Sequence, residues 1–170
     1  MAIDPLVTPL LGVELFHGLK PLQLTEIARY AERIVFRAGD KITESGADAD
    51  AAFLIVGGSA EWLSAQADAT EPIEIGSLIS EMAMLIEHVH GASIVARGQV
   101  RCLKLKRETM HKLMIEDAEL ALHLTDKISA RLRRVADELR AIDDEFGDVA
   151  GGIICADPAA AGEALGVRVH

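Results

Sequence analysis

Six short runs of β-forming residues between positions 34 and 105 constrain the fold of this chain most strongly. Glycine, aspartate and serine separate the runs, and these residue types form tight turns. In the last run Leu103 and Leu105 alternate with Lys104 and Lys106, which is the two-residue period of a strand with one solvated face. Several short strands joined by tight turns are typical of a β-sandwich or a β-barrel. The six predicted strands span residues 34–36, 51–56, 60–63, 73–75, 92–96 and 100–105.

Segments with helical spacing flank this β-rich region. Apolar residues recur at helical spacing over 6–11 and over 22–33, and Pro21 suits the first turn of the second of these helices. After the last strand, the spacing over 108–115 predicts another short helix. The pattern therefore indicates a β-rich core with helices before and after it, which is an α+β fold.

A long helix is predicted to follow. Asp117 is a suitable N-cap, and the helical pattern continues to about Phe146. Apolar residues in this helix follow one another at steps of four and three, which places them in a narrow stripe at the heptad period. Such a stripe either packs on its own domain or pairs two subunits into a homodimer, and the sequence leaves both options open. We call this stripe the 128–146 seam; it comprises Ile128, Leu132, Val135, Leu139, Ile142 and Phe146.

The 170 residues of the chain are enough for one domain and a short appendage. We expect residues 1–146 to form the domain. The segment 147–170 is rich in alanine and glycine and contains Pro158, so we expect it to be a disordered tail.

The composition of the chain argues against nucleic-acid and membrane partners. With 17 basic and 27 acidic residues the formal net charge is −10, whereas binding to nucleic acid needs a dense basic surface. No apolar run approaches the roughly 18 residues that span a bilayer, and residues 1–16 lack the basic residues of a signal peptide. Cys102 and Cys155 lie far apart, so no disulfide framework is indicated. We therefore expect a cytoplasmic protein that binds neither nucleic acid nor a membrane.

Two glycine-containing motifs hold the most specific information. The first consists of Gly-Asp-Lys-Ile at 39–42, then Gly46, then Phe-Leu-Ile-Val-Gly-Gly at 53–58. The second is Gly-Ser-Leu-Ile-Ser-Glu-Met-Ala-Met-Leu at 76–85, followed by His-Gly-Ala-Ser at 90–93. A turn, a one-turn helix and a returning strand would fold the second motif into a pocket.

In this order, the motifs resemble those of the cyclic nucleotide-binding domain family, and the resemblance runs from about Phe16 to Arg140. It implies an eight-stranded antiparallel β jelly-roll barrel, flanked by N-terminal helices and a long C-terminal helix. It also implies four structural glycines, which are Gly39, Gly46, Gly58 and Gly76.

The resemblance further implies that the second motif is a phosphate-binding cassette. Glu81 stands where the family has a glutamate that accepts the ribose 2′-hydroxyl, and Ser80 replaces the glycine before it. His90 falls where the family has the arginine that grips the cyclic phosphate. The predicted ligand-binding residues are Gly76, Ser80, Glu81, Met82, Ala83, His90, Gly91, Ala92 and Ser93.

The change from arginine to His90 matters because the two side chains present different charges. Arginine offers a planar, permanently charged fork that meets two phosphate oxygens, whereas imidazole is mostly neutral near pH 7 and offers single donors. Losing a bidentate charged pair weakens binding by about 10²–10⁴-fold. We therefore expect a stand-alone regulatory or sensor domain with weak or no affinity for cAMP and cGMP, which signals through an unidentified effector protein.

Two alternatives stay open. In the first, the chain is a genuine cAMP- or cGMP-binding signalling protein. Glu81 then holds the ribose, while backbone N–H groups at Met82 and Ala83 and the hydroxyl of Ser80 or Ser93 hold the phosphate. In the second, the barrel is a scaffold without a small-molecule ligand, and the 128–146 seam pairs two subunits.

Catalytic and metal-binding patterns are absent from the sequence. His88 and His90 form a His-x-His pair, which on a strand places both imidazoles on one face, but no carboxylate follows within 91–96. We interpret them as loop histidines and expect no metal. The sequence contains neither a Gly-x-Ser-x-Gly elbow nor a P-loop, so we expect no enzymatic activity and no catalytic residue.

Overall fold

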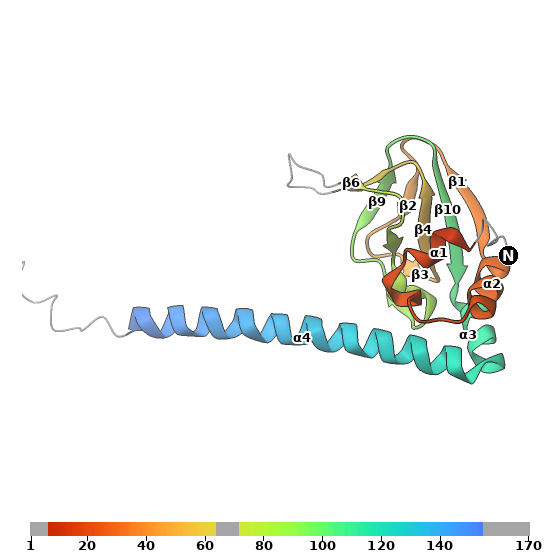
Figure 1. The fold of residues 1–170 in the computed structure, drawn as a ribbon. Helices are drawn as coiled ribbons and strands as arrows, with labels where there is room; N and C mark the ends of the chain where they lie inside the picture. The colour runs from red at the N-terminus through yellow and green to blue at the C-terminus, as the bar shows by residue number, and fades with distance from the viewer. Residues whose placement is uncertain (1–6, 64–71, 155–170) are drawn as a thin grey trace, which may run out of the picture. The chain divides into compact units, whose positions relative to one another are not determined.

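The structure is a computed structural model that describes residues 7–63 and 72–154, with side chains described as far as Ile142. The chain forms two units, and the boundary between them lies after Ile128. The first unit contains every strand (Figure 1). The second consists, in the described residues, of the rest of the last helix.

Ten short strands are present in the described part of the chain, and all their pairings are antiparallel. The strands are β1 (Glu32–Phe36), β2 (Lys41–Thr43), β3 (Asp48–Ala49), β4 (Ala51–Gly57), β5 (Ala60–Leu63), β6 (Pro72–Ile73), β7 (Leu78–Ile79), β8 (His88–Val89), β9 (Ser93–Ala96) and β10 (Val100–Lys106).

These strands form three sheets. Sheet A has the order β1-β10-β4-β7, sheet B has the order β2-β9-β5-β6, and sheet C consists of β3 and β8. The predicted α+β jelly-roll architecture is confirmed, with ten strands in three sheets where we expected eight strands in one closed barrel. The strands that the sequence did not predict are short: β2 has three residues, and β3, β7 and β8 have two each, too few to show a two-residue period in the sequence.

The helices are α1 (Thr8–Leu11), η1 (Glu14–Phe16), α2 (Pro21–Tyr30), η2 (Glu81–Met84), α3 (Arg107–Glu116) and α4 (Ala118–Ile154), where η denotes a 3₁₀ helix. The prediction of a helix over 22–33 is wrong at its C-terminal end. Ala31 is already extended, and Glu32 and Arg33 pair with Lys104 and Leu103 in sheet A. Strand pairing overrides the helical spacing of these residues.

Strand β4 is buried on both faces of sheet A, which explains why it is an almost uninterrupted apolar run. Ala52 and Leu54 pack into a core on the side of α1, α2 and α3. Phe53 and Ile55 point the other way, into a core shared with sheet B. In Figure 1, α1 lies over the face of the sheet that contains β4.

Asp117 caps α4 as the sequence predicts. Its carboxylate accepts hydrogen bonds from the backbone N–H groups of Glu119 at 2.9 Å and Leu120 at 3.0 Å, and from the side-chain amide of Gln23 at 2.8 Å. The Gln23 bond is the main reason that the pKa of Asp117 is lowered, and the backbone bonds contribute further. The cap fixes the point at which α4 begins.

The 128–146 seam divides between the two units. Ile128 is buried in the core of the first unit. In the second unit the seam residues from Leu132 to Ile142 are between 45% and 59% exposed, and the side chain of Phe146 lies outside the described residues. The segment expected to be a disordered tail begins within α4, which extends to Ile154; residues 155–170 also lie outside the described part.

Candidate functional site

The predicted cassette, residues 76–93, leaves β7, forms the single turn η2 and returns through β8 to β9. Gly76 has a φ of +93°, and its N–H donates to the carbonyl of Ile55 at 2.8 Å, which anchors the start of the cassette to β4. The one-turn helix and the returning strand predicted from the sequence are therefore present.

Ser80 stands at a backbone position that favours glycine. Its φ of 55° and ψ of 42° are left-handed, and it is the one residue other than glycine with a positive φ in the described part of the chain. A side chain at this conformation costs free energy that glycine does not pay. Glycine, which the resemblance implies at this position, would avoid the strain.

His90 is bonded to Ser80 across the cassette. Its Nδ1 lies 2.9 Å from Ser80 Oγ, and the imidazole is half-buried. Partial burial lowers the pKa of His90, and the nearby His88 lowers it further, while Asp50 opposes the shift. The lowered pKa favours the neutral imidazole at pH 7, so position 90 carries no permanent charge.

The backbone of His90 is held by the loop at Gly46 and Ala47, which lies within the first glycine motif. The N–H of Gly46 donates to the carbonyl of His90 at 2.8 Å, and the N–H of His90 donates to the carbonyl of Ala47 at 2.9 Å. Gly46 has a φ of +82°, as a tight turn at this point requires. The structure thus brings the two sequence motifs together.

The end of the cassette is held by Thr43 and Ser45, two residues that the motifs do not predict. Ser93 Oγ accepts a hydrogen bond from the N–H of Ser45 at 2.9 Å, and Thr43 Oγ1 donates to the carbonyl of Ala92 at 3.0 Å. Ser45 Oγ also donates to the carbonyl of exposed Gly91 at 3.3 Å. These residues come from β2 and its following loop, and only the pairing of β2 with β9 reveals them.

The residues of η2 serve partly in packing. Ala83 is fully buried, and Met82 packs against the helix-side core. The N–H of Ala83 already donates to the carbonyl of Ser80 at 2.9 Å, so this N–H is not available to an anion without a rearrangement. Glu81 begins the turn and is partly buried.

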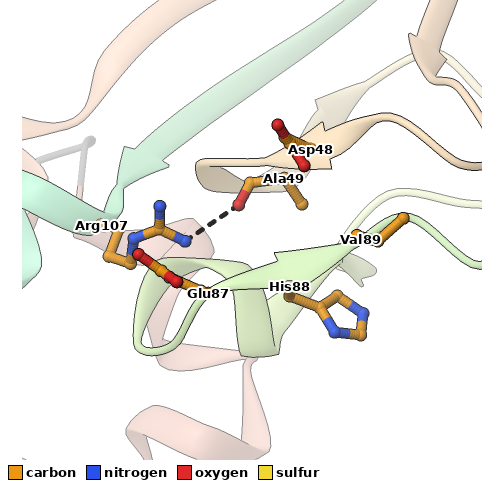
Figure 2. A pocket seen from close by; sticks show the side chains of 6 residues that line it. All are labelled: Asp48, Ala49, Glu87, His88, Val89 and Arg107. Atoms are coloured by element: carbon orange, nitrogen blue, oxygen red, sulfur yellow. Dashed lines mark hydrogen bonds between the residues drawn. The ribbon is translucent and has the colours of Figure 1, made fainter.

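The β8 segment of the cassette lines part of a cavity of about 520 Å³, whose lining residues are Asp48, Ala49, Glu87, His88, Val89 and Arg107 (Figure 2). None of the nine predicted ligand-binding residues lines it. The Arg107 guanidinium donates to the carbonyls of Ala49 at 3.0 Å and Ile86 at 2.9 Å. Figure 2 shows the imidazole of His88 directed away from this guanidinium. Arg107 therefore ties α3 to β3 and to the segment between η2 and β8.

The described residues contain no group of three or more histidine, cysteine, aspartate or glutamate side chains that could hold a metal ion. Within the same part of the chain, no helix is both long and apolar enough to cross a membrane. The His88-x-His90 pair accordingly stands without a third ligand in the described structure.

Comparison with known families identifies the fold. A model of the cyclic nucleotide-binding domain matches residues 33–117, which is half of the chain. The chain belongs to the cyclic nucleotide-binding domain family. The matched segment runs from β1 to the residue that caps α4, so it contains the whole cassette of this cyclic nucleotide-binding domain.

A curated relative shares part of this domain. The chain is similar to a cAMP-dependent protein kinase regulatory subunit of Aspergillus fumigatus, at 33% identity over 110 residues. The similarity covers 62% of this chain and 26% of the relative, so the chain spans about a quarter of the relative's length. The predicted resemblance to the family is confirmed.

Solved structures give the same result. A cyclic nucleotide-binding-like protein from Brucella abortus bv. 1 str. 9-941 has a TM-score of 0.60 at 29% identity, over 67% of this chain and 100% of that chain. The catabolite activator protein of Thermus thermophilus has a TM-score of 0.62 at 28% identity, over 76% and 62%. The N-terminal domain of a transcriptional regulator from Streptomyces coelicolor A3(2), at 20% identity and a TM-score of 0.67 over 74% and 90%, shares the fold.

Proposed function

We propose that this chain is a cyclic nucleotide-binding-like regulatory module with weak or no affinity for cAMP and cGMP. The observation that carries the proposal is the imidazole of His90, which is bonded to Ser80 and which the resemblance assigns to the position of the phosphate-gripping arginine. Its lowered pKa leaves it neutral at physiological pH. An anion entering the cassette therefore meets no fixed positive charge from this position.

The binding free energy lost when histidine stands in place of arginine supports weak binding. Charge-assisted hydrogen bonds contribute about 1.5–3 kcal/mol each, so two bonds to a phosphate are worth about 10²–10⁴-fold in affinity. The hydroxyls of Ser80 and Ser93 offset part of this loss, but each already takes part in a hydrogen bond within the protein. A site that binds in the micromolar range with arginine is expected near the millimolar range here.

Calorimetric titration of the full chain with cAMP and with cGMP at neutral pH tests the proposal. We expect dissociation constants of about 1 mM or weaker for both nucleotides. A micromolar dissociation constant for either nucleotide would contradict the proposal. A change in the ionic strength provides a check, because residual phosphate binding weakens as salt screens the charge.

A second candidate is genuine cyclic nucleotide sensing. Two observations favour it: the similarity to a cAMP-dependent protein kinase regulatory subunit, and the presence of Glu81 at the position that the resemblance assigns to the ribose. In that case the ribose and base contribute most of the binding free energy. Mass spectrometry of the denatured, freshly purified protein separates the candidates, since a tight binder carries nucleotide from its expression host.

The module is proposed to act without catalysis and to pass its state to an effector protein or to a second copy of itself. The 128–146 seam supports the second route, because its residues in the second unit are exposed. The predicted cytoplasmic location and the absence of a nucleic-acid partner remain proposals that rest on the acidic composition of the chain.

A further inference from the structure

A groove on the α1 side of sheet A carries two arginines and an apolar floor. It encloses about 360 Å³, and its lining includes Pro9, Arg33, Val35, Val56, Arg101 and Leu103. Val56 and Leu103 belong to the helix-side core, whereas Val35 is 55% exposed. This volume lies within the range of small-molecule sites, which are mostly apolar with a few polar groups that fix orientation.

The strand register places both arginines on the same face of the sheet. Arg33 is paired with Leu103, and Val35 is paired with Arg101. The two arginines are therefore diagonal neighbours across β1 and β10, about 7–8 Å apart at the backbone, which long side chains can bridge. Val35 and Leu103 are the other two residues of these neighbouring pairs.

The position of Arg101 depends on a bulge and on a glycine. The pairing of β10 with β4 shifts its register between Arg101 and Cys102, and such a bulge redirects a side chain. The Arg101 guanidinium lies against the backbone of Gly57, where an added Cβ would come within 2.7 Å of both Nε and Nη2. Glycine at position 57 therefore leaves room for the guanidinium over β4.

Neither arginine is neutralised within the described residues. Arg29, Arg97 and Arg140 each have a carboxylate partner, whereas Arg33 and Arg101 form no ion pair in the described part of the chain. Two like charges on neighbouring positions of one sheet face repel each other. In a chain with an excess of acidic residues, this pair is a local site of positive charge that a bound anion would stabilise.

We propose that this groove binds an amphiphilic carboxylate, a small molecule with one carboxylate head and an apolar body. The carboxylate lies between Arg33 and Arg101, because guanidinium groups match carboxylate geometry with paired hydrogen bonds. The apolar body covers Val35 and Val56. A small ligand fits better than a protein partner, since the apolar surface here is limited to the floor of one groove. The inference does not depend on the nucleotide affinity of the cassette.

Amide NMR spectra of the ¹⁵N-labelled full chain, titrated with sodium decanoate below its micelle concentration, test the proposal. We expect saturable shifts at Val35, Val56 and Gly57. Arg33→Gln and Arg101→Gln should each weaken the affinity for decanoate by about 10-fold, the loss expected for one charged hydrogen-bonded contact. Arg37→Gln is the matched control, because Arg37 is exposed just beyond β1 and does not line the groove.

The same titration with decanol separates the head group from the apolar body. We expect decanol to bind at least about 10-fold more weakly than decanoate, since it lacks the charge that the arginines recognise. Equal binding of the two probes would overturn the proposal. Shifts confined to other surfaces, no saturable binding, or full affinity in both arginine variants would overturn it as well.

Discussion

Position 90 decides which charge the cassette presents, and its own titration can be observed. Since the pKa of His90 in the folded protein is lowered from the ordinary value of about 6.5, the unfolded chain binds this proton more readily. The contribution of neutral His90 to stability is therefore fully present above about pH 6.5 and is lost as the pH falls through the lowered pKa.

His90→Gln should reduce the loss of stability on acidification. The glutamine variant does not titrate, so its midpoint of urea unfolding should change less between pH 7 and pH 5 than that of the unmodified chain. Urea titrations of both proteins at both pH values make the comparison. An equal or larger change in the variant would show that His90 is not held neutral in the folded state.

Ser80 has a left-handed backbone, so glycine should be a more stabilising replacement than alanine at this position. Ser80→Gly should be more stable than Ser80→Ala by about 1 kcal/mol, because both variants lose the bond to His90 but only alanine keeps the backbone strain. Chemical denaturation measures the difference. Ser77, a neighbouring turn residue without a positive φ, is the control, and there alanine should be the more stable replacement.

At the scale of elements, sequence reasoning succeeds where a run is long enough to show its period. The strands predicted over 51–56 and 100–105 are present as β4 and β10, which have seven residues each. The prediction missed β2, which has three residues and is defined by pairing with β9. Local residue pattern cannot reveal an element that only a distant partner stabilises.

In the candidate site, too, local motifs are predictable from the sequence, whereas contacts between distant segments are not. The motifs predict the positions of Glu81 and His90, and the turn chemistry of Gly46. They do not predict the bond between Ser80 and His90 or the bond between Ser45 and Ser93, because these contacts arise from tertiary packing. The groove at Arg101 depends on a register shift, for which the sequence gives no signal.

Alanine substitutions at two glycines with nearly the same φ separate the cost of backbone strain from the cost of a steric clash. A Cβ at Gly58 would lie 2.3 Å from the carbonyl oxygen of Gln99, whereas a Cβ at Gly39 meets nothing within 4 Å. Gly58→Ala should therefore lower the free energy of unfolding by about 3 kcal/mol, and Gly39→Ala by about 1 kcal/mol. Thermal and urea unfolding of the two variants measure both values. Equal effects would mean that the turn at Gly58 relaxes to admit the methyl group.

For the whole molecule, the 128–146 seam is the feature that would join two copies. Its exposed residues in the second unit lie on one stripe, and burying them between two helices would be favourable. The seam spans fewer than the three or four heptads typical of a coiled coil.

The double variant Leu132→Asp, Leu139→Asp should convert a dimer into a monomer, because each charge would be buried at the centre of the pairing surface. Light scattering coupled to size exclusion gives the mass of each protein. Leu122→Asp is the control, since Leu122 is 64% exposed on α4 but lies outside the seam. A monomeric unmodified chain, or an unchanged mass in the double variant, would exclude pairing through this stripe.

The central claim is that the cassette binds cyclic nucleotides poorly because position 90 lacks a guanidinium. The most direct measurement is the ratio of cAMP affinities of His90→Arg and the unmodified chain, determined by calorimetry in one buffer. We predict that the arginine variant binds about 10²–10⁴-fold more tightly. Equal affinities in the two proteins would contradict the claim.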